Sequence, residues 1–420
     1  MTRGERPWNR AVRRLASYRR FGDTGRNERS NVLDRAIVIV MDSCGAGEAP
    51  DAPEYGDEGS DTLGHTAQVV GGLDLPNFAA AGLGNLHGNI LGVPAVDTPT
   101  MAFGRLTEAS AGKDSTTGHW EIAGVITERA DATFTETGFP RQLVEAVEQE
   151  SGHRFFGNYA ASGTVIIEDL GPRHIETGEL ILYTSADSVF QIAAHKDVVP
   201  LEELYRVCRI ARKHCNDYRI GRIIARPFEG VPGSFQRTYE RQDFALPPHS
   251  PTMLDIAQEN GVPTYGIGKI EDLFTGRGLD RAVHTEGDTD GLEHTLQGLE
   301  QMERGLIMVN LVDLDMVYGH RENPEGYAAG LGVIDSFLPR LMAALGPRDV
   351  MIFAADHGND PTDGSTDHTR EYVPLLVAGL KSASVDLGIR ATYADVAATV
   401  CDGFDIPLPS AGTSFLGEIT

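Results

Sequence analysis

The sequence predicts an α/β protein whose core is a mostly parallel sheet flanked by helices, with a smaller α/β domain inserted into it. Three apolar runs predict central strands, at 35–43 (RAIVIVMDS), 305–315 (GLIMVNLVDLD) and 349–360 (DVMIFAADHGND). Continuous runs rich in β-branched residues are typical of strands buried on both faces of a parallel sheet. Helical patterns at 326–345 and 393–404 are expected to cover that sheet as crossover connections.

The rest of the chain divides around this core. Residues 1–34 are rich in arginine and lack the apolar segment of a secretory signal. We therefore expect either a disordered basic tail or a translation start assigned too far upstream, with a mitochondrial presequence as the alternative. Residues 131–249 carry their own helix and strand patterns and end in a Pro- and Arg-rich segment. We expect them to form an inserted domain, leaving a core of 35–130 and 250–420.

Charge and composition limit the partners of the chain. With 420 residues it is long enough for two domains. Its net charge of -25 argues against duplex DNA, RNA or an anionic membrane surface, because each of these would repel it. No apolar run reaches the roughly 18 residues of a membrane span. The four cysteines are scattered and form no C-x-x-C pair, which suits a reducing compartment. We therefore expect a cytoplasmic protein without nucleic-acid or membrane partners.

Acidic and histidine side chains follow the three buried strands. Ligands in open α/β sheets collect outside the carboxyl ends of the strands, so these side chains are expected to meet. A single histidine is more often structural, but this combined set of carboxylates and imidazoles suits Mn²⁺, Zn²⁺ or Mg²⁺. Six ligands indicate two cations that clamp the attacking and leaving oxygens of a phosphoryl transfer. The candidate ligands are Asp42, Asp315, His320, Asp356, His357 and His368.

The segment 112–121 (GKDSTTGHWE) contains three adjacent hydroxyls, Ser115, Thr116 and Thr117. A hydroxyl is a poor nucleophile at neutral pH, but coordination to a divalent cation lowers its pKa. The alternative is a capping or turn role, which is the commoner use of Ser/Thr clusters. The proposed metal ligands favour the interpretation that one of the three is a nucleophile.

The order of these features resembles the alkaline phosphatase superfamily, and over about 35–418 the chain is similar to its phosphopentomutase family. The matching stretches are VMDSCGAGEAPDA, GSDTLGHTA, GKDSTTGHWEIAG, YTSADSVFQIAAH, IARPFEGVPGSF, NLVDLDMVYGHR, ADHGNDPTDGSTDHTREYVPLL and GTSFL. Superfamily membership alone would leave a phosphatase, a sulfatase or a cofactor-independent phosphoglycerate mutase open. The long matches inside the predicted insertion favour the phosphopentomutase family.

The resemblance implies an enzyme that interconverts the 1- and 5-phosphates of ribose or 2-deoxyribose through a phosphoserine and a 1,5-bisphosphate intermediate. It places the nucleophile at Ser115, where the family usually has threonine. One metal, expected to be Mn²⁺, would be held by Asp42, Asp356, His357 and the Ser115 oxygen. The second would be held by Asp315, His320 and His368. A sugar bisphosphate, either ribose 1,5-bisphosphate or glucose 1,6-bisphosphate, would act as the phosphorylating activator.

The resemblance also implies a site for the pentose phosphate. Arg226, Arg241 and Lys269 would hold the phosphate that is not transferred, with Ser185 and Asp187 near the sugar. The inserted domain would act as a lid that keeps water from the phosphoserine. The alternative function is a metal-dependent phosphomonoesterase or a related phosphonate or sulfate hydrolase, which would share the core site and need no bisphosphate.

Overall fold

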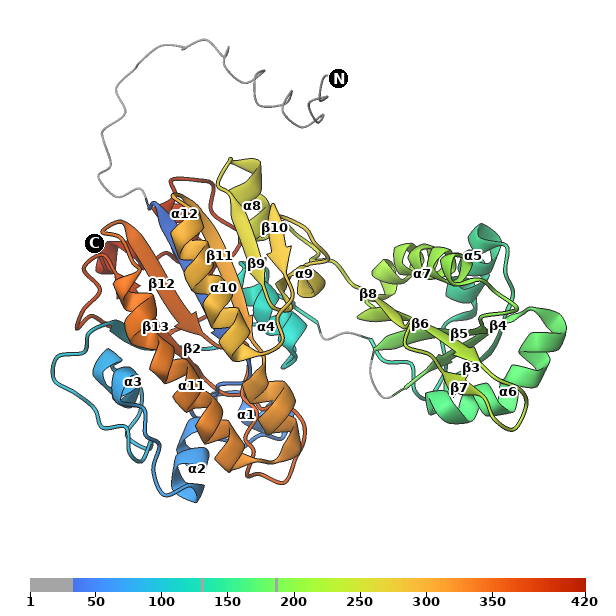
Figure 1. The fold of residues 1–420 in the computed structure, drawn as a ribbon, viewed down its shortest axis with the longest axis horizontal. Helices are drawn as coiled ribbons and strands as arrows, with labels where there is room; N and C mark the ends of the chain where they lie inside the picture. The colour runs from blue at the N-terminus through green and yellow to red at the C-terminus, as the bar shows by residue number, and fades with distance from the viewer. Residues whose placement is uncertain (1–32, 130–131, 186–187) are drawn as a thin grey trace, which may run out of the picture.

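The computed structural model describes residues 33–129, 132–185 and 188–420, and these residues form two separate β-sheets (Figure 1). The larger sheet has eight strands in the order β10-β9-β11-β1-β12-β13-β2-β14, and most of its neighbouring strands run parallel. The predicted fold class, an α/β protein with a large, mostly parallel sheet flanked by helices, is confirmed. The tail predicted at 1–34 lies almost wholly outside the described residues.

The three apolar runs form the centre of the larger sheet, as predicted. Strand β1 (Arg35–Met41) lies between β11 (Gly305–Leu311) and β12 (Asp349–Ala354), parallel to both. All residues of β11 and β12 are buried, because helices and loops cover both faces. The carboxyl ends of the three strands therefore lie side by side at one edge of the sheet, although the strands are far apart in the sequence.

Helices α10 and α11 lie in front of the larger sheet in Figure 1 and pack against each other, whereas α12 packs against α8 and α4. Two of them match the predicted helical patterns, α11 (Pro324–Ala343) and α12 (Asp395–Gly403). The other strands of this unit are β2 (Ala102–Leu106), β9 (Thr264–Ile267), β10 (Arg281–Val283), β13 (Val373–Gly379) and β14 (Asp386–Arg390). Its other helices are α1 (Ala52–Tyr55), α2 (Thr62–Val69), α3 (Pro76–Ala81), α4 (Ser115–Ile122), α8 (Met253–Glu259), α9 (Ile270–Leu273) and α10 (Asp288–Gln301), with short turns at Leu83–Asn85, Leu314–Tyr318, Gly319–Arg321 and Leu416–Glu418.

The smaller sheet forms a second unit beside the first (Figure 1). Its strands are β3 (Phe155–Ala160), β4 (Leu180–Thr184), β5 (Val189–His195), β6 (Arg222–Glu229), β7 (Gln236–Arg237) and β8 (Gln242–Ala245). Helices α5 (Arg141–Ser151) and α7 (Leu201–Cys215) share one hydrophobic cluster with the sheet, and α6 (Gly163–Thr177) shares a separate one; a short turn lies at Asn216–Tyr218. We call this part of the chain, residues 132–245, the smaller unit.

Local sequence explains the ends of several helices. Helix α7 has Glu202 and Glu203 in its first turn and basic residues in its last, which complements the helix dipole. Helix α4 begins after Asp114, whose side chain accepts a hydrogen bond from the Thr117 amide. No helix among the described residues is long and apolar enough to cross a membrane.

Candidate metal centre and nucleophile

Ser115 begins helix α4, and the helix cap decides how the neighbouring hydroxyls are used. Asp114 Oδ2 accepts a hydrogen bond from Thr117 Oγ1 at 2.6 Å, and Asp114 Oδ1 accepts one from the Thr117 amide at 3.1 Å. Asp114 therefore caps the helix, and the Thr117 hydroxyl is held by that cap. Ser115 Oγ instead lies 3.1 Å from His357 Nε2, at the edge of the predicted ligand cluster.

Asp42, Asp356 and His357 form one compact group at the ends of β1 and β12. Each offers a ligand atom within 4.8 Å of the others, and all three side chains are buried. His357 Nε2 lies 3.6 Å from Asp42 Oδ1 and 3.4 Å from Asp356 Oδ2. Burial and the nearby carboxylates of Asp356 and Asp315 raise the pKa of Asp42 well above its usual range. These carboxylates repel one another unless a cation lies between them.

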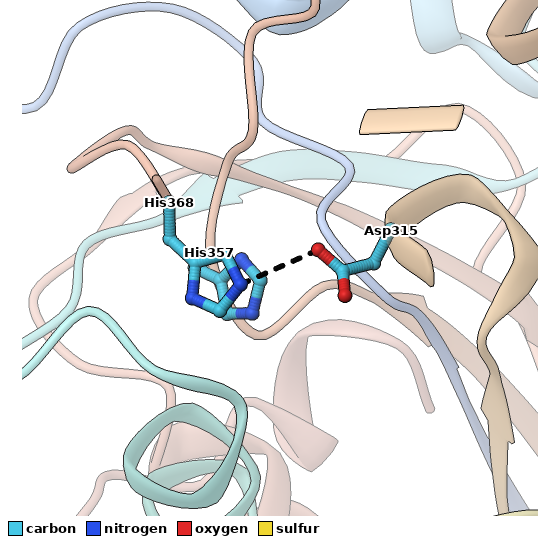
Figure 2. A group of neighbouring side chains, drawn as sticks. All are labelled: Asp315, His357 and His368. Carbon is cyan, nitrogen blue, oxygen red and sulfur yellow. Dashed lines mark ion pairs between the residues drawn. The ribbon is translucent and has the colours of Figure 1, made fainter. Parts of the chain in front are cut away.

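Asp315, His357 and His368 form a second compact group (Figure 2). His368 Nε2 lies 3.4 Å from Asp315 Oδ1, and the imidazole rings of His357 and His368 stack with centroids 3.7 Å apart. His320 adjoins the group, with Nε2 3.3 Å from Asp315 Oδ2 and 3.2 Å from His368 Nε2. Burial opposes ionisation of Asp315, but the hydrogen bond with His368 and the charges of nearby histidines lower its pKa to about 2.

The structure thus brings all six predicted ligands and Ser115 to one edge of the sheet. The predicted division assigns three of these side chains to each metal, and the observed grouping differs from it in one respect. His357 belongs to both compact groups, and His320 adjoins the second group through Asp315 and His368. The donor set fits divalent cations: it combines carboxylate oxygens with imidazole nitrogens. Asp42 Oδ1 is also buried without a hydrogen-bond partner in the described part of the chain, an arrangement that is costly without a counter-charge.

Two buried polar residues that were not predicted support this centre. Asn310 Nδ2 donates to Asp42 Oδ2 at 2.9 Å and lies 3.2 Å from His119 Nε2. His119 Nδ1 lies 2.8 Å from the carbonyl oxygen of Ser115 and 3.0 Å from Asp356 Oδ2. The sequence did carry signals for both: Asn310 stands near the end of a buried strand, and His119 lies one helical turn after Ser115.

The loop before Ser115 is anchored by the segment that carries His368. His368 Nδ1 donates to the carbonyl oxygen of Lys113 at 2.9 Å, so its other nitrogen faces the ligand cluster. Arg370 is almost fully buried and donates through Nη1 to the carbonyl oxygen of Gly112 at 2.7 Å and to Glu108 Oε2 at 2.6 Å. These bonds hold the backbone ahead of Ser115 in place.

The predicted substrate residues lie in two places. Arg226 and Arg241 line one cavity of about 660 Å³ in the smaller unit. Arg226 Nε donates to Gln191 Oε1 at 3.0 Å, and Gln191 Nε2 lies 3.5 Å from Ser185 Oγ, so these three side chains share one face of the sheet. Asp187 lies outside the described residues.

Lys269 belongs to the larger unit instead. It is the residue that precedes α9, and its charge lowers the pKa of Asp42, so it lies on the side of the metal centre. The predicted phosphate-binding cations are therefore divided, with arginines in the smaller unit and this lysine near the candidate ligands.

Comparison with known proteins identifies the family. The Metalloenzyme superfamily matches residues 34–408. The phosphopentomutase of Dictyoglomus turgidum is 51% identical over 389 residues, covering 92% of this chain and 98% of that protein. The phosphopentomutase of Anaeromyxobacter dehalogenans is 52% identical over 387 residues, with coverage of 92% and 98%.

A crystal structure of Leishmania mexicana phosphoglycerate mutase shares the fold, with a TM-score of 0.50, 12% identity and coverage of 92% of this chain and 98% of that one. The family match and the two relatives each extend over most of the chain, so they confirm the prediction that this chain is an enzyme. It belongs to the phosphopentomutase family of the metalloenzyme superfamily.

Proposed function

We propose that this enzyme interconverts the 1- and 5-phosphates of ribose and 2-deoxyribose through phosphorylated Ser115. The observation that carries the proposal is the position of the Ser115 hydroxyl, 3.1 Å from His357 Nε2 within a cluster of carboxylates and imidazoles. The names of the relatives, which are about half identical to this chain, support pentose phosphates as the substrates.

Two divalent cations, which we propose to be Mn²⁺, would be held by the six clustered side chains. Asp42, Asp356 and His357 would hold one, together with the Ser115 oxygen, and Asp315, His320 and His368 would hold the other. When bound, such cations lower the pKa of a hydroxyl and stabilise the charge of a transferred phosphoryl group.

Ser115 would be phosphorylated by a sugar bisphosphate and would then donate its phosphoryl group to the free hydroxyl of a bound pentose phosphate. The resulting 1,5-bisphosphate would turn within the site and return its other phosphoryl group to Ser115. The position of Ser115 at the start of α4 supports this role, because the amides and dipole of a helix amino terminus favour a phosphate. The hydrogen bond from His368 to the Lys113 carbonyl would keep the nucleophile aligned during both transfers.

The smaller unit would bind the rest of the substrate. Arg226 and Arg241 would hold the phosphate that is not transferred, with Ser185 and Asp187 beside the sugar and Lys269 on the side of the metal centre. Arginine is suited to this role because its planar group forms two parallel hydrogen bonds with phosphate. Closure of residues 131–249 over the core would exclude water, so that the phosphoserine reacts with sugar hydroxyls and not by hydrolysis.

The test is incubation of the full-length protein with ribose 5-phosphate, Mn²⁺ and a trace of ribose 1,5-bisphosphate, following ribose 1-phosphate and free phosphate together. We expect ribose 1-phosphate as the main product, with turnover that depends on the bisphosphate. Rapid release of phosphate from aryl esters without a bisphosphate would instead identify a phosphomonoesterase.

Ser115→Ala tests the nucleophile, with Thr116→Ala as the matched control. We expect Ser115→Ala to abolish both turnover and covalent labelling by a radiolabelled bisphosphate, while Thr116→Ala keeps both. Substantial labelling of the Ser115→Ala variant would show that another group is the nucleophile.

A further inference from the structure

We propose that Arg237, the Tyr183 hydroxyl and the amino-terminal end of α6 complete a phosphate-binding site with Arg226 and Arg241 in the smaller unit. The inference rests on the proposed function and makes it more specific. It names the groups that bind the phosphate which is not being transferred.

The first argument is the concentration of positive charge in one cavity. Arg226, Arg237 and Arg241 all line it, in a chain whose net charge is -25. Arg241 is paired with Asp243, at 2.6 Å from Nε to Oδ1. Arg237 has neither an ion pair nor a side-chain hydrogen bond with any residue that the structure describes, and the Arg226 side chain has a hydrogen bond with Gln191 but no carboxylate partner among those residues.

Asp243 compensates Arg241, but Arg226 and Arg237 have no carboxylate partner among the described residues. Burial lowers the pKa of Arg226, and the charges of Arg241 and Arg237 lower it further. No carboxylate is among the residues that line the cavity. Guanidinium groups that line one cavity repel one another, and an anion bound between them would remove the repulsion.

The second argument is a buried hydroxyl beside one of these arginines. Tyr183 is 1% exposed, and its hydroxyl has no hydrogen-bond partner in the described part of the chain. A Cβ atom added at Gly163 would lie 2.8 Å from Tyr183 Oη and 3.3 Å from Arg237 Nη1. The tyrosine hydroxyl and the arginine therefore lie close together beside Gly163, and a side chain at position 163 would contact both of them.

The third argument is the start of α6, which begins at Gly163. Ser162 precedes the helix and its side chain makes no capping hydrogen bond, so the amides of the first turn lack side-chain acceptors. Thr164, in that first turn, lines the cavity with the arginines. Guanidinium, hydroxyl and helix amides are all donors, and this combination suits a phosphate and excludes a cation.

The position of the cavity fits a sugar phosphate. Gln191 joins Arg226 to Ser185 on the same face of the sheet. A phosphate bound by the arginines would therefore have its sugar directed along this face toward Ser185, which we propose lies near the sugar.

The test is calorimetric titration of the full-length, metal-loaded protein with ribose 5-phosphate. It is made in a Ser115→Ala background, so that no transfer through that hydroxyl accompanies binding. Arg237→Ala is expected to raise the Kd about 10- to 100-fold, because a charge-assisted hydrogen bond is lost. Tyr183→Phe and Gly163→Ala are expected to raise it roughly 3- to 10-fold, and Arg237→Lys is expected to bind better than Arg237→Ala.

Two controls separate recognition from folding. Arg141→Ala removes an exposed arginine on α5 that is paired with Glu145, and it should leave the Kd unchanged. Tyr183→Phe removes a hydroxyl without a partner, so the ligand-free variant should be at least as stable to urea as the parent. Its stabilisation by ribose 5-phosphate should nevertheless be weaker. If the hydroxyl had a structural role, the ligand-free Tyr183→Phe variant would instead be less stable to urea than the parent.

A Kd within twofold of the parent in both Arg237→Ala and Tyr183→Phe would overturn the inference. The outcome is distinct from failure of the proposed function. If ribose 5-phosphate binding depends on Arg237 but no ribose 1-phosphate is formed, the site stands and the mutase reaction is refuted. If the mutase reaction occurs and both variants bind normally, only this site is refuted.

Discussion

Replacement of Arg370 tests whether the loop ahead of Ser115 depends on one buried cation. Arg370 is 2% exposed and its guanidinium is fully engaged. Nη1 donates to Glu108 and to the Gly112 carbonyl, Nη2 donates to the Glu108 carbonyl at 2.8 Å, and Nη2 and Nε both reach Asp51. We predict that Arg370→Met destabilises the fold and slows turnover, because the Gly112 carbonyl loses its anchor.

The magnitude follows from the partner that is left behind. Glu108 is almost fully buried, and burial already raises its pKa although Arg370 acts to lower it. Breaking a buried pair by removing one partner costs about 3–5 kcal/mol, mostly because the other charge is left without compensation. We therefore expect Arg370→Met to lower the free energy of unfolding by about 3–5 kcal/mol at pH 7. In the double variant Arg370→Met/Glu108→Gln, part of that loss should be recovered.

The assay is urea unfolding of the four proteins of this cycle at pH 7 and a fixed metal concentration, because bound metal contributes to stability. Arg340→Met is the matched control, since Arg340 forms an exposed ion pair with Glu293 and its loss should not be measurable. The reasoning is refuted if Arg370→Met loses less than about 1 kcal/mol, the range of a surface pair. It is also refuted if the double variant is no more stable than Arg370→Met.

The remaining predictions concern pH, metal content and the smaller unit. Burial raises the pKa of Asp288 to about 7. Between about pH 4 and 7 its carboxyl therefore stays protonated in the folded protein but ionises in the unfolded chain. The free energy of unfolding consequently falls as pH rises through this range. The free energy of unfolding of Asp288→Asn, measured in urea, should therefore rise by up to about 4 kcal/mol relative to that of the parent between pH 4 and 8. If the free energies of unfolding of the two proteins depend on pH in the same way, this prediction is wrong. His320→Ala and His368→Ala should each bind one cation fewer, as measured by elemental analysis, and should each lower kcat by several orders of magnitude. A metal content equal to that of the parent would show that the replaced histidine is not a metal ligand. Replacing 131–249 by a short Gly/Ser linker should leave a folded core, because Leu246 is the one member of the large hydrophobic cluster of the described residues that falls within the replaced segment. This core should lose pentose phosphate exchange but keep slow phosphate release from aryl phosphates, and retained exchange would show that substrate recognition lies elsewhere.

The central sheet and the positions of its candidate ligands were predictable because burial on both faces is visible in composition. Strands β1, β11 and β12 are mostly apolar, with Asn310 in β11 as the main interruption, and Asp42, Asp315 and Asp356 follow these strands closely. Helix α6 was not predicted, because Gly171 and Pro172 interrupt its pattern and Pro172 nevertheless lies inside the helix. Helix propensity is a local preference, and packing against β4 and β5 overrides it here.

Sequence spacing also could not decide contacts that depend on side-chain direction. His357 lies in both candidate ligand groups, and its ring stacks on that of His368. No sequence motif indicates this stacking. The role of Arg370 was likewise hidden, since a buried arginine looks like any surface arginine until its carboxylate and carbonyl partners are known.

The parallel arrangement of β11, β1 and β12 has a thermodynamic consequence. The candidate ligands come from chain positions as far apart as Asp42 and His368, and they are neighbours only because these strands are adjacent. The unfolded chain therefore has no equivalent cluster, and a cation that binds here binds the native state alone. Such binding stabilises the fold by about 2.7 kcal/mol when the free cation is at a hundred times its Kd. We therefore expect the melting temperature of this protein to rise with free metal concentration and to fall when a chelator removes the metal.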